Sequence, residues 1–285
     1  MSWQIYKVIL QLCSPMHIGC GQVGNLQHTR PYIPGRVIWG ALTMRITRDI
    51  AKSGVAADDS RIYREVGEQV HRDLAFTYFY PALQSENTYQ VNWPWEEENL
   101  FRYRFLSSYT GTALDYPQQS VVRGMLREVE FISPYTLDKG KPVLLLGYIF
   151  EKKGCGLPWK KAVKQLQLGG ERSYGWGNIK LEGDILPSKD NNLFDKKIEF
   201  QIRNGEPWVR LPAKERLLAH TVDNGLAVIG EIEPLVGREW RSGQESDRYA
   251  GQHVSFDEIC FTPGSVLADT IDFLIGNFGV WKQGV

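Results

Sequence analysis

The nine residues from 169 to 177 contain four glycines, and this segment limits the possible folds more than any other in the chain. It follows a short amphipathic pattern at residues 157–166, which has Pro158 near its start, and precedes a strand-like run at residues 178–183. Glycine accepts positive φ and has no Cβ, so successive backbone N–H groups can converge on an anion. The segment therefore predicts a loop between a helix and a strand, either as a plain glycine-rich turn or as a contact for a sugar-phosphate backbone.

The other side chains of this segment suit the second possibility. Arg172 would supply a charged donor and Ser173 a neutral one, and Tyr174 or Trp176 could stack on a base or ribose. The segment does not fit the phosphate-binding loop pattern G-x-x-x-x-G-K-[ST]. It does not fit a dinucleotide fingerprint either, because that motif lies between a strand and a helix.

The hydrophobic patterns place this loop in an ordered series of elements. The order is strand, helix, strand, strand, helix, strand: residues 3–12, a helix between Gly35 and Gly54, and then residues 124–132, 142–150, 157–166 and 178–183. The first helix shows Ile38, Leu42, Ile46 and Ile50 at intervals of four residues. This βαββαβ order is that of an α+β, ferredoxin-like (RRM-like) domain.

Two further regions complete the predicted organisation. An insertion at about residues 55–122 would hold a helix at 59–74 and aromatic stretches of strand composition at 76–80, 89–93 and 101–105. Short strand-like runs separated by glycine and proline follow residue 184. We therefore expect a ferredoxin-like domain at residues 1–183 and a β-rich C-terminal unit at residues 184–285.

Charge and composition exclude several classes of protein. The chain has 33 Lys+Arg and 33 Asp+Glu, and this neutral balance argues against a free-standing, salt-driven nucleic-acid binder. Basic zones at residues 30–52 and 152–180 stand out locally, although either could be a solvated helix face. No apolar run approaches the roughly 20 residues that span a bilayer, and the first residues lack the pattern of a signal peptide. We expect no membrane contact and a cytoplasmic location.

The cysteines give no strong metal signal. Cys13, Cys20, Cys155 and Cys260 form no C-x-x-C pair, so we expect reduced, mostly buried thiols. A metal site that joins Cys13 and Cys20 to His17 is a weaker alternative. We therefore expect neither a metal nor another cofactor.

Two motifs together resemble a known family. The glycine segment resembles the signature loop G-G-x-R-S-x-G-x-G of the RAMP superfamily, matched here by Gly169, Gly170, Arg172, Ser173, Gly175 and Gly177. Residues 16–19 (Met-His-Ile-Gly) and 31–35 (Pro-Tyr-Ile-Pro-Gly), with Gly40 and Leu42, resemble the segments that open these proteins. The two motifs occur in the family's order and cover about the first 183 residues.

The resemblance implies a function and a set of partners. It implies an RNA-binding subunit of a type III CRISPR effector complex in antiviral defence, either of the backbone kind or of the kind that caps the 5' tag. The expected partners are the CRISPR guide RNA, the target RNA that pairs with it, and other Cas subunits of the ribonucleoprotein.

In this family, a Pro-Gly turn brings a helix N-terminus to the RNA backbone, here Pro34 and Gly35. Free N–H groups and the helix dipole favour phosphate at such a terminus. Arg36, Trp39 and Thr43 stand where the family commonly has serine, lysine and arginine. We expect Arg30 and Arg36 to be the phosphate partners, and Trp39 either to pack in the core or to stack on RNA.

Residues 109–115 and 125–132 resemble the β-hairpin "thumb" of backbone subunits, which in the family wedges between guide and target bases. Thr110, Thr112 and Asp115 are the candidate thumb residues. An ordinary connecting hairpin is the alternative.

The loop after the first strand bears on catalysis. Many type III backbone subunits cut target RNA with an aspartate in this loop, but residues 14–31 contain neither Asp nor Glu. We therefore expect a binding subunit without target cleavage. One alternative is a guide-processing RAMP endoribonuclease with His28 or His17 as general base. Another is a carbohydrate- or protein-binding β domain that uses the nine tryptophans as platforms.

Overall fold

The computed structural model describes residues 2–50, 59–86, 88–117, 120–195, 197–242 and 253–284. Helices and several β-sheets are both present, so the predicted mixed α+β class is confirmed. In the described part of the chain, no helix is long and apolar enough to cross a membrane.

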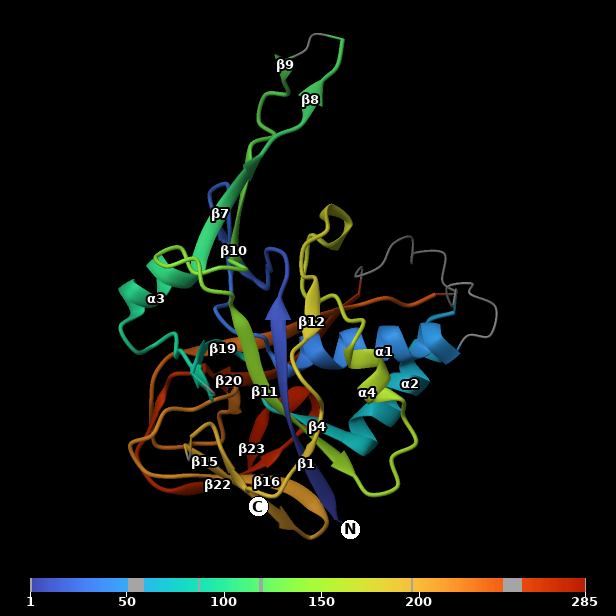
Figure 1. Cartoon of the computed structure of the whole chain (residues 1–285), viewed down its shortest axis with the longest axis vertical. Coiled ribbons are helices and arrows are strands. Elements are labelled where there is room, and N and C mark those ends of the chain that lie inside the picture. Colours follow the sequence, from blue (N-terminus) through green and yellow to red (C-terminus); the bar gives the residue numbers. More distant parts are fainter. Residues whose placement is uncertain are drawn as a thin grey trace.

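A central antiparallel sheet lies in the middle of the molecule (Figure 1). Its neighbouring strands follow the order β12, β1, β11, β5, β6, with β13 beside β1 and β4 beside β11. The bounds are β1 Trp3–Leu12, β4 Leu74–Phe76, β5 Tyr80–Ser85, β6 Thr88–Val91, β11 Leu144–Lys152, β12 Ile179–Leu181 and β13 Pro187–Ser188. The strands expected at residues 3–12, 142–150 and 178–183 are therefore present and adjacent.

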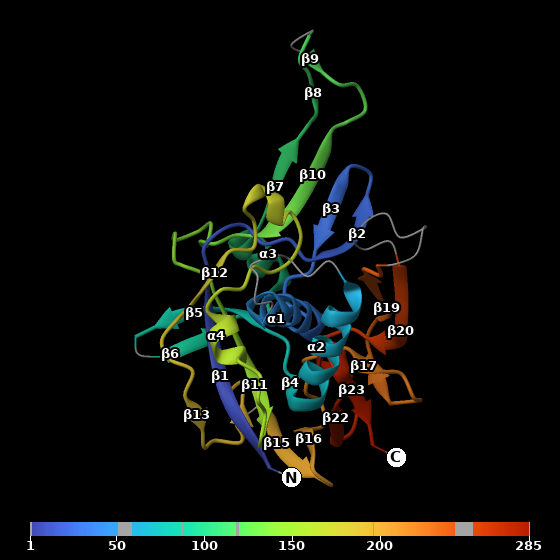
Figure 2. The ribbon, with the colours of Figure 1, turned by 90° about the vertical axis from the view of Figure 1, so that its right-hand side faces the viewer.

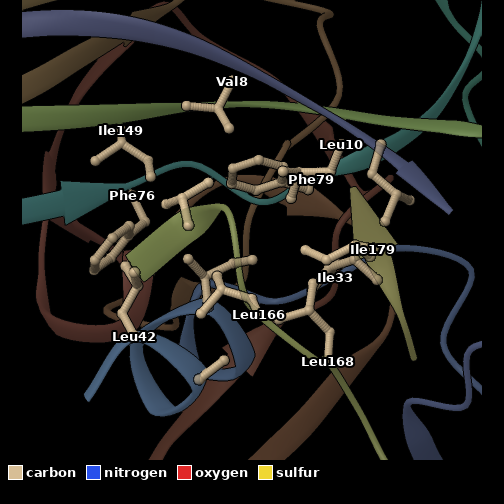
Figure 3. Close-up of a cluster of buried hydrophobic side chains, with 14 of the residues drawn as sticks. Val8, Leu10, Ile33, Leu42, Phe76, Phe79, Ile149, Leu166, Leu168 and Ile179 are labelled. Atoms are coloured by element: carbon tan, nitrogen blue, oxygen red, sulfur yellow. The ribbon is translucent and has the colours of Figure 1, made fainter. Parts of the chain in front are cut away.

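Three helices cover one face of this sheet: α1 (Gly35–Ile50), α2 (Ser60–Asp73) and α4 (Trp159–Val163). Ile38, Leu42 and Ile46 of α1 are buried against β1 and β11, as their spacing predicts. Figure 3 shows this core, with Leu42 facing Phe76 and Ile149. The predicted helix at 59–74 is α2, and Asp59 caps its first turn by accepting the Arg61 N–H.

The C-terminal residues cover the opposite face of the central sheet. Trp3, Ile5 and Phe150 of the sheet pack in one buried cluster with C-terminal residues, and the Phe150 and Phe200 rings stack at 4.4 Å. The C-terminal sheet has the order β14-β15-β16-β22-β23-β17-β20-β19, and β18 pairs with β21 separately. The bounds are β14 Asn192–Leu193, β15 Ile198–Arg203, β16 Glu206–Leu211, β17 Thr221–Val222, β18 Val228–Ile229, β19 Ile232–Glu239, β20 His253–Phe261, β21 Val266–Leu267, β22 Ile271–Ile275 and β23 Trp281–Gln283, with a 3₁₀ turn η2 at Asn277–Gly279.

A third sheet supports an arm that projects from the body at the top of Figure 1. Its order is β2-β3-β10-β7, and a further strand pair, β8 with β9, lies toward the tip of the arm. The bounds are β2 Gly19–Val23, β3 Leu26–Thr29, β7 Leu106–Gly111, β8 Leu114–Asp115, β9 Ser120–Val121 and β10 Arg127–Ile132, with helix α3 at Glu98–Phe105 before β7.

The structure corrects the predicted assignment of the second core strand. The strand expected at 124–132 is β10, and it pairs with β3 and β7 rather than with the central sheet. The place beside β11 is taken by β4 and β5, which come from the predicted insertion. All of β4 and the first three residues of β5 are buried, so no alternation of polar and apolar residues marked them as sheet members. The predicted start of the insertion, at about residue 55, lies outside the described residues.

Other local predictions were also wrong. Residues 101–105, expected as a strand, belong to helix α3, because Phe101 and Phe105 are four residues apart and pair on one helix face with ring centroids 4.8 Å apart. Residues 14–31, expected as a loop, contain the hairpin β2–β3. Cys13 and Cys20 are exposed rather than buried, because they lie just after β1 and on the exposed strand β2.

Candidate nucleic-acid interface

The glycine segment is held against the loop that follows β1. The Gly170 N–H donates to the His17 carbonyl at 2.8 Å, and the Gly177 N–H donates to the Pro15 carbonyl at 2.7 Å. At Gly169, with φ +81°, a Cβ would lie 2.4 Å from the His17 carbonyl oxygen. At Gly177, with φ +76°, it would lie 1.8 Å from the Leu168 oxygen. These two glycines are therefore required by close backbone contacts and by positive φ.

The middle of the segment forms an exposed crest. Arg172–Tyr174 is one 3₁₀ turn, η1, and Gly175 follows it with φ +81° and no atom within 4 Å of its Cβ position. Ser173 is exposed, and the Tyr174 ring is 70% exposed. Arg172 contacts the protein through its Nη1, which donates to the Met44 Sδ at 3.4 Å. The crest therefore presents a guanidinium, a hydroxyl and an aromatic ring to solvent.

The base of the crest contacts the projecting arm. Arg127 of β10 lies 5.2 Å over the Tyr174 ring and pairs with Glu171 at 3.2 Å. Trp176 packs edge-on against Phe131 at 5.1 Å and against Tyr109 at 6.3 Å. An open groove of about 670 Å³ lies between the arm and the crest, and Tyr109, Arg127, Tyr174 and Trp176 line it. The two regions that the sequence singled out separately thus form one surface.

The thumb candidates lie on different parts of the arm. Thr112 lines the groove. Thr110 pairs with Glu128 in the ladder, and strand alternation turns it to the face opposite Tyr109 and Gly111. Asp115 lies farther out, opposite Ser120 in the β8–β9 pair. The hairpin itself is confirmed; only Thr112 of the three candidates belongs to the groove.

Arg127 and Tyr109 were not among the predicted site residues. Both lie on one face of the β7–β10 ladder, where Arg127 opposes Gly111 and Tyr109 opposes Val129. That face follows from strand alternation once the register of the hairpin is known. The sequence left the register open, so these residues could not be chosen from it.

The start of α1 does not face the groove. Gly35 is buried, and a Cβ on it would lie 2.3 Å from the Phe278 carbonyl oxygen of η2. Pro34 precedes the helix, and its carbonyl accepts the Val37 N–H at 3.0 Å. Trp39 donates from Nε1 to the Gly67 carbonyl at 2.9 Å and stacks on His71 at 4.9 Å. The packing of η2 explains why glycine is needed at position 35.

The two arginines expected to bind phosphate both pair with carboxylates of β19. Arg30 forms a bidentate pair with Glu233 of β19, at 2.7 and 2.9 Å. Burial alone would lower the pKa of Arg30, but the hydrogen bonds to Glu233 outweigh burial and raise it. Arg36 donates to the Ser255 Oγ at 2.9 Å, pairs with Glu239 at 3.4 Å and lies 4.4 Å over the Phe278 ring. Arg30 therefore joins the segment before α1 to β19, and Arg36 joins the first turn of α1 to β19 and β20.

Glu233 is also the partly exposed end of a polar chain that reaches into the core. The His220 Nε2 lies 2.6 Å from Glu233, and its Nδ1 lies 2.7 Å from the Tyr78 hydroxyl. A carboxylate only accepts, so Nε2 carries the proton and Nδ1 accepts from Tyr78. Burial would raise the pKa of Glu233, but hydrogen bonds from His220 and Arg30 lower it to about 2. Burial lowers the pKa of His220, which keeps its ring neutral.

The two candidate catalytic histidines meet at Glu130 of β10. His17 is buried, and its Nδ1 donates to the Glu130 backbone carbonyl at 2.7 Å. The His28 Nδ1 lies 3.4 Å from the Glu130 carboxylate, which also pairs with Arg102 at 2.6 Å. Residues 14–31 contain no acid, but β10 brings the Glu130 carboxylate to this loop, a contact that no local sequence pattern predicts. Within the described ranges, no cluster of histidine, cysteine and acidic residues has the arrangement of a metal site.

Comparison with known proteins places the chain in a family. A model of the RAMP superfamily matches residues 9–180. Among curated proteins, no significant match was found. Among solved structures, the chain is similar at 13% identity and TM-score 0.49 to a chain of the type III-B Cmr-beta complex bound to cognate target RNA and AMPPnP, over 92% of this chain and 85% of that one.

Two more structures of this complex are also similar. One chain, from Cmr-beta bound to cognate target RNA, has 10% identity and TM-score 0.40, over 62% of this chain and 96% of that one. Another chain, from the apo state of Cmr-beta, has 9% identity and TM-score 0.40, over 66% of this chain and 98% of that one. The family model covers more than half of the sequence, and on that ground the chain belongs to the RAMP superfamily.

Proposed function

We propose that this chain is a guide RNA-binding subunit of a type III CRISPR ribonucleoprotein, and that it holds the RNA between the projecting arm and the glycine crest. The single observation that carries the proposal is the groove itself. Tyr109, Tyr174 and Trp176 line it together with Arg127, and Arg172 stands on the adjoining crest. Aromatic rings beside guanidinium groups are the side chains that hold single-stranded nucleic acid without reading its sequence.

The proposal assigns roles to the predicted residues. Arg172 and Arg127 bind phosphates, with the Ser173 hydroxyl as a neutral donor. Arg127 pairs with Glu171, but its side chain is 42% exposed, compared with 17% for Arg30 and 22% for Arg36. Tyr174, Tyr109 and Trp176 offer stacking surfaces, and Gly169, Gly170, Gly175 and Gly177 shape the loop that presents them. Arg30, Arg36 and Gly35 join the chain around the start of α1 to the C-terminal residues, through Glu233, Ser255 and Phe278.

The proposal includes an assignment of the fold. We take β1, α1, β4 with β5, β11, α4 and β12 as the βαββαβ series of a ferredoxin-like, RRM-like domain within residues 1–183. The β-rich residues 184–285 would form the second unit. The arm that contains Thr110, Thr112 and Asp115 would be the thumb, inserted between guide and target bases.

The wider setting rests on the resemblance of the motifs. We infer that the subunit acts in antiviral defence in the cytoplasm, with other Cas subunits as neighbours and target RNA reached through the guide. A net charge of zero suits a subunit whose surface is shared between RNA and proteins. Whether it repeats along the guide or caps the 5' tag is decided by its copy number in the purified complex.

The binding site can be tested on the full chain. Labelled single-stranded RNA with a CRISPR repeat sequence is titrated with the wild-type protein and with the Tyr174→Ala variant. We expect a loss of affinity of about fivefold or more, the lower end of what one stacked base contributes. Tyr103→Ala is the matched control, because Tyr103 lies on α3 and is 64% exposed. Equal affinity of both variants would contradict the proposed site.

The contact between His28 and Glu130 supports a second candidate function, guide processing. A carboxylate 3.4 Å from the His28 Nδ1 can orient the ring of a general base. Metal-free incubation of repeat RNA with the protein tests this. Cleavage that disappears in His28→Ala would establish the endoribonuclease. RNA that stays intact would exclude guide processing and leave RNA binding as the function.

A further inference from the structure

A second cavity lies on the helical side of the molecule. It has a volume of about 620 Å³ and lies between α1, α2, the end of β19 and η2. Figure 2 looks onto α1 and α2, with β19 and β20 beside them. A volume of this size is in the range of sites that hold a small molecule or one nucleotide.

Aromatic rings form much of the cavity wall. Trp39 and His71 stack with their planes 10° apart, and Phe278 packs edge-on against Trp39 at 5.0 Å. Tyr63 of α2 and Trp240, just after β19, pair edge-on at 5.8 Å. Burial, and to a lesser extent Arg36, lower the pKa of His71 to about 4, so its ring is a neutral aromatic surface near pH 7. The cavity is therefore suited to a flat ring.

Charged side chains also line the cavity, and two of the arginines among them are exposed. Arg64 and Arg238 line the cavity and are exposed, and neither forms an ion pair with any residue that the structure describes. Glu68 and Glu239 also line the cavity, and Glu239 pairs with Arg36 at 3.4 Å. The available guanidinium groups thus favour an anionic group near the mouth.

Flat ring surfaces beside exposed guanidinium groups suit the base and the phosphate of a nucleotide.

The cavity adjoins the glycine crest. Met44 lines the cavity, and its Sδ accepts the hydrogen bond from Arg172 at 3.4 Å. A strand that crosses the crest therefore reaches the mouth of the cavity directly. We propose that this cavity binds one unstacked nucleotide of the RNA that lies on the crest, with its base among the aromatic rings and its phosphate at Arg64 and Arg238. This inference rests on the proposed function and adds a base-binding site to it.

The test uses wall residues that are only partly buried, so that folding is retained. Full-length Tyr63→Ala and Trp240→Ala are titrated with labelled single-stranded RNA, alongside Tyr63→Phe, Trp240→Phe and the control Tyr103→Ala. We expect each alanine variant to lose about fivefold or more in affinity, and each phenylalanine variant to retain binding because it keeps a stacking ring. Thermal unfolding of every variant confirms that it is folded.

Photocrosslinking places the nucleotide. RNA with 4-thiouridine at successive positions should crosslink to the peptide of Tyr63 or Trp240 at one position, and to that of Tyr174 at neighbouring positions. In a parallel arm, AMP and UMP are titrated by tryptophan fluorescence. A free mononucleotide that fills the cavity and is not displaced by RNA would overturn the assignment to RNA.

The RNA affinities of the cavity variants and of Arg172→Ala distinguish a failure of this inference from a failure of the proposed function. If the cavity variants bind RNA as Tyr103→Ala does while Arg172→Ala weakens binding, the cavity site is wrong and the crest remains. If no variant weakens binding, both proposals are wrong.

Discussion

At the scale of single residues, Gly175 and Gly177 have the same backbone conformation but different surroundings. Both have positive φ, yet only Gly177 has backbone within reach of a Cβ. Gly175→Ala should reduce the free energy of unfolding by about 1–2 kcal/mol, the cost of a left-handed residue. Gly177→Ala adds a clash with Leu168 and should cost at least about 3 kcal/mol. Urea denaturation of both variants measures this, and equal losses would refute the role of the close contact.

The carboxylate of Glu233 makes stability depend on pH. Its pKa of about 2 in the folded protein lies below the ordinary value, so its contribution is complete above about pH 4.5 and is lost as the pH falls toward 2. His220 acts in the same direction, because its neutral form is favoured by folding and protonation below about pH 6.5 favours the unfolded chain.

Glu233→Gln should therefore be destabilised at neutral pH, by about 2–3 kcal/mol, because Arg30, whose side chain is 17% exposed, loses its counter-charge. The difference in unfolding free energy from wild type should narrow by roughly 2 kcal/mol between pH 6 and pH 3. Denaturation at several pH values measures it. A difference that does not change with pH would show that Glu233 does not carry the acid dependence.

At the scale of elements, the sequence predicted those helices and strands whose buried residues recur at a regular spacing or form a continuous apolar run. Helix α1 followed from Ile38, Leu42 and Ile46, and β1 from its apolar run. Sheet membership is set by long-range pairing, which no local pattern contains. The sequence therefore placed β10 in the wrong sheet, and it assigned the stretch of strand composition at 76–80, which overlaps β4 and β5, to the insertion. The glycine segment was predicted from its motif. The place of Arg127 on the same surface could not be predicted, because it depends on the register of the β7–β10 hairpin.

The arm offers an element-scale prediction. Gly111 and Arg127 are opposite each other, so replacement of residues 112–126 by Asn-Gly closes the hairpin with a two-residue turn. Leu114, Tyr116 and Val121 in the removed part are exposed, so the midpoint of thermal unfolding should not change. A thumb predicts that affinity for guide-like RNA falls about fivefold. An ordinary connecting hairpin predicts unchanged affinity, and this result would exclude the thumb.

At the scale of the whole molecule, the C-terminal residues complete the core of the central sheet. Phe150 packs on Phe200, and Arg30 pairs with Glu233, so the two proposed units share buried contacts. A chain of residues 1–183 would expose one face of its sheet. We expect it to be insoluble or to unfold without a cooperative transition. A cooperative calorimetric transition for 1–183 would instead establish an independent domain.

The central claim is that the surface between the arm and the crest binds RNA through phosphate contacts. The most direct measurement is the affinity of the full chain for single-stranded RNA over a series of salt concentrations, for wild type and for Arg127→Ala combined with Arg172→Ala. Each phosphate contact adds about 0.7 to the slope of log affinity against log salt for single strands. The double variant should bind more weakly, with a slope shallower by about 1.4. An unchanged affinity and slope would contradict the claim.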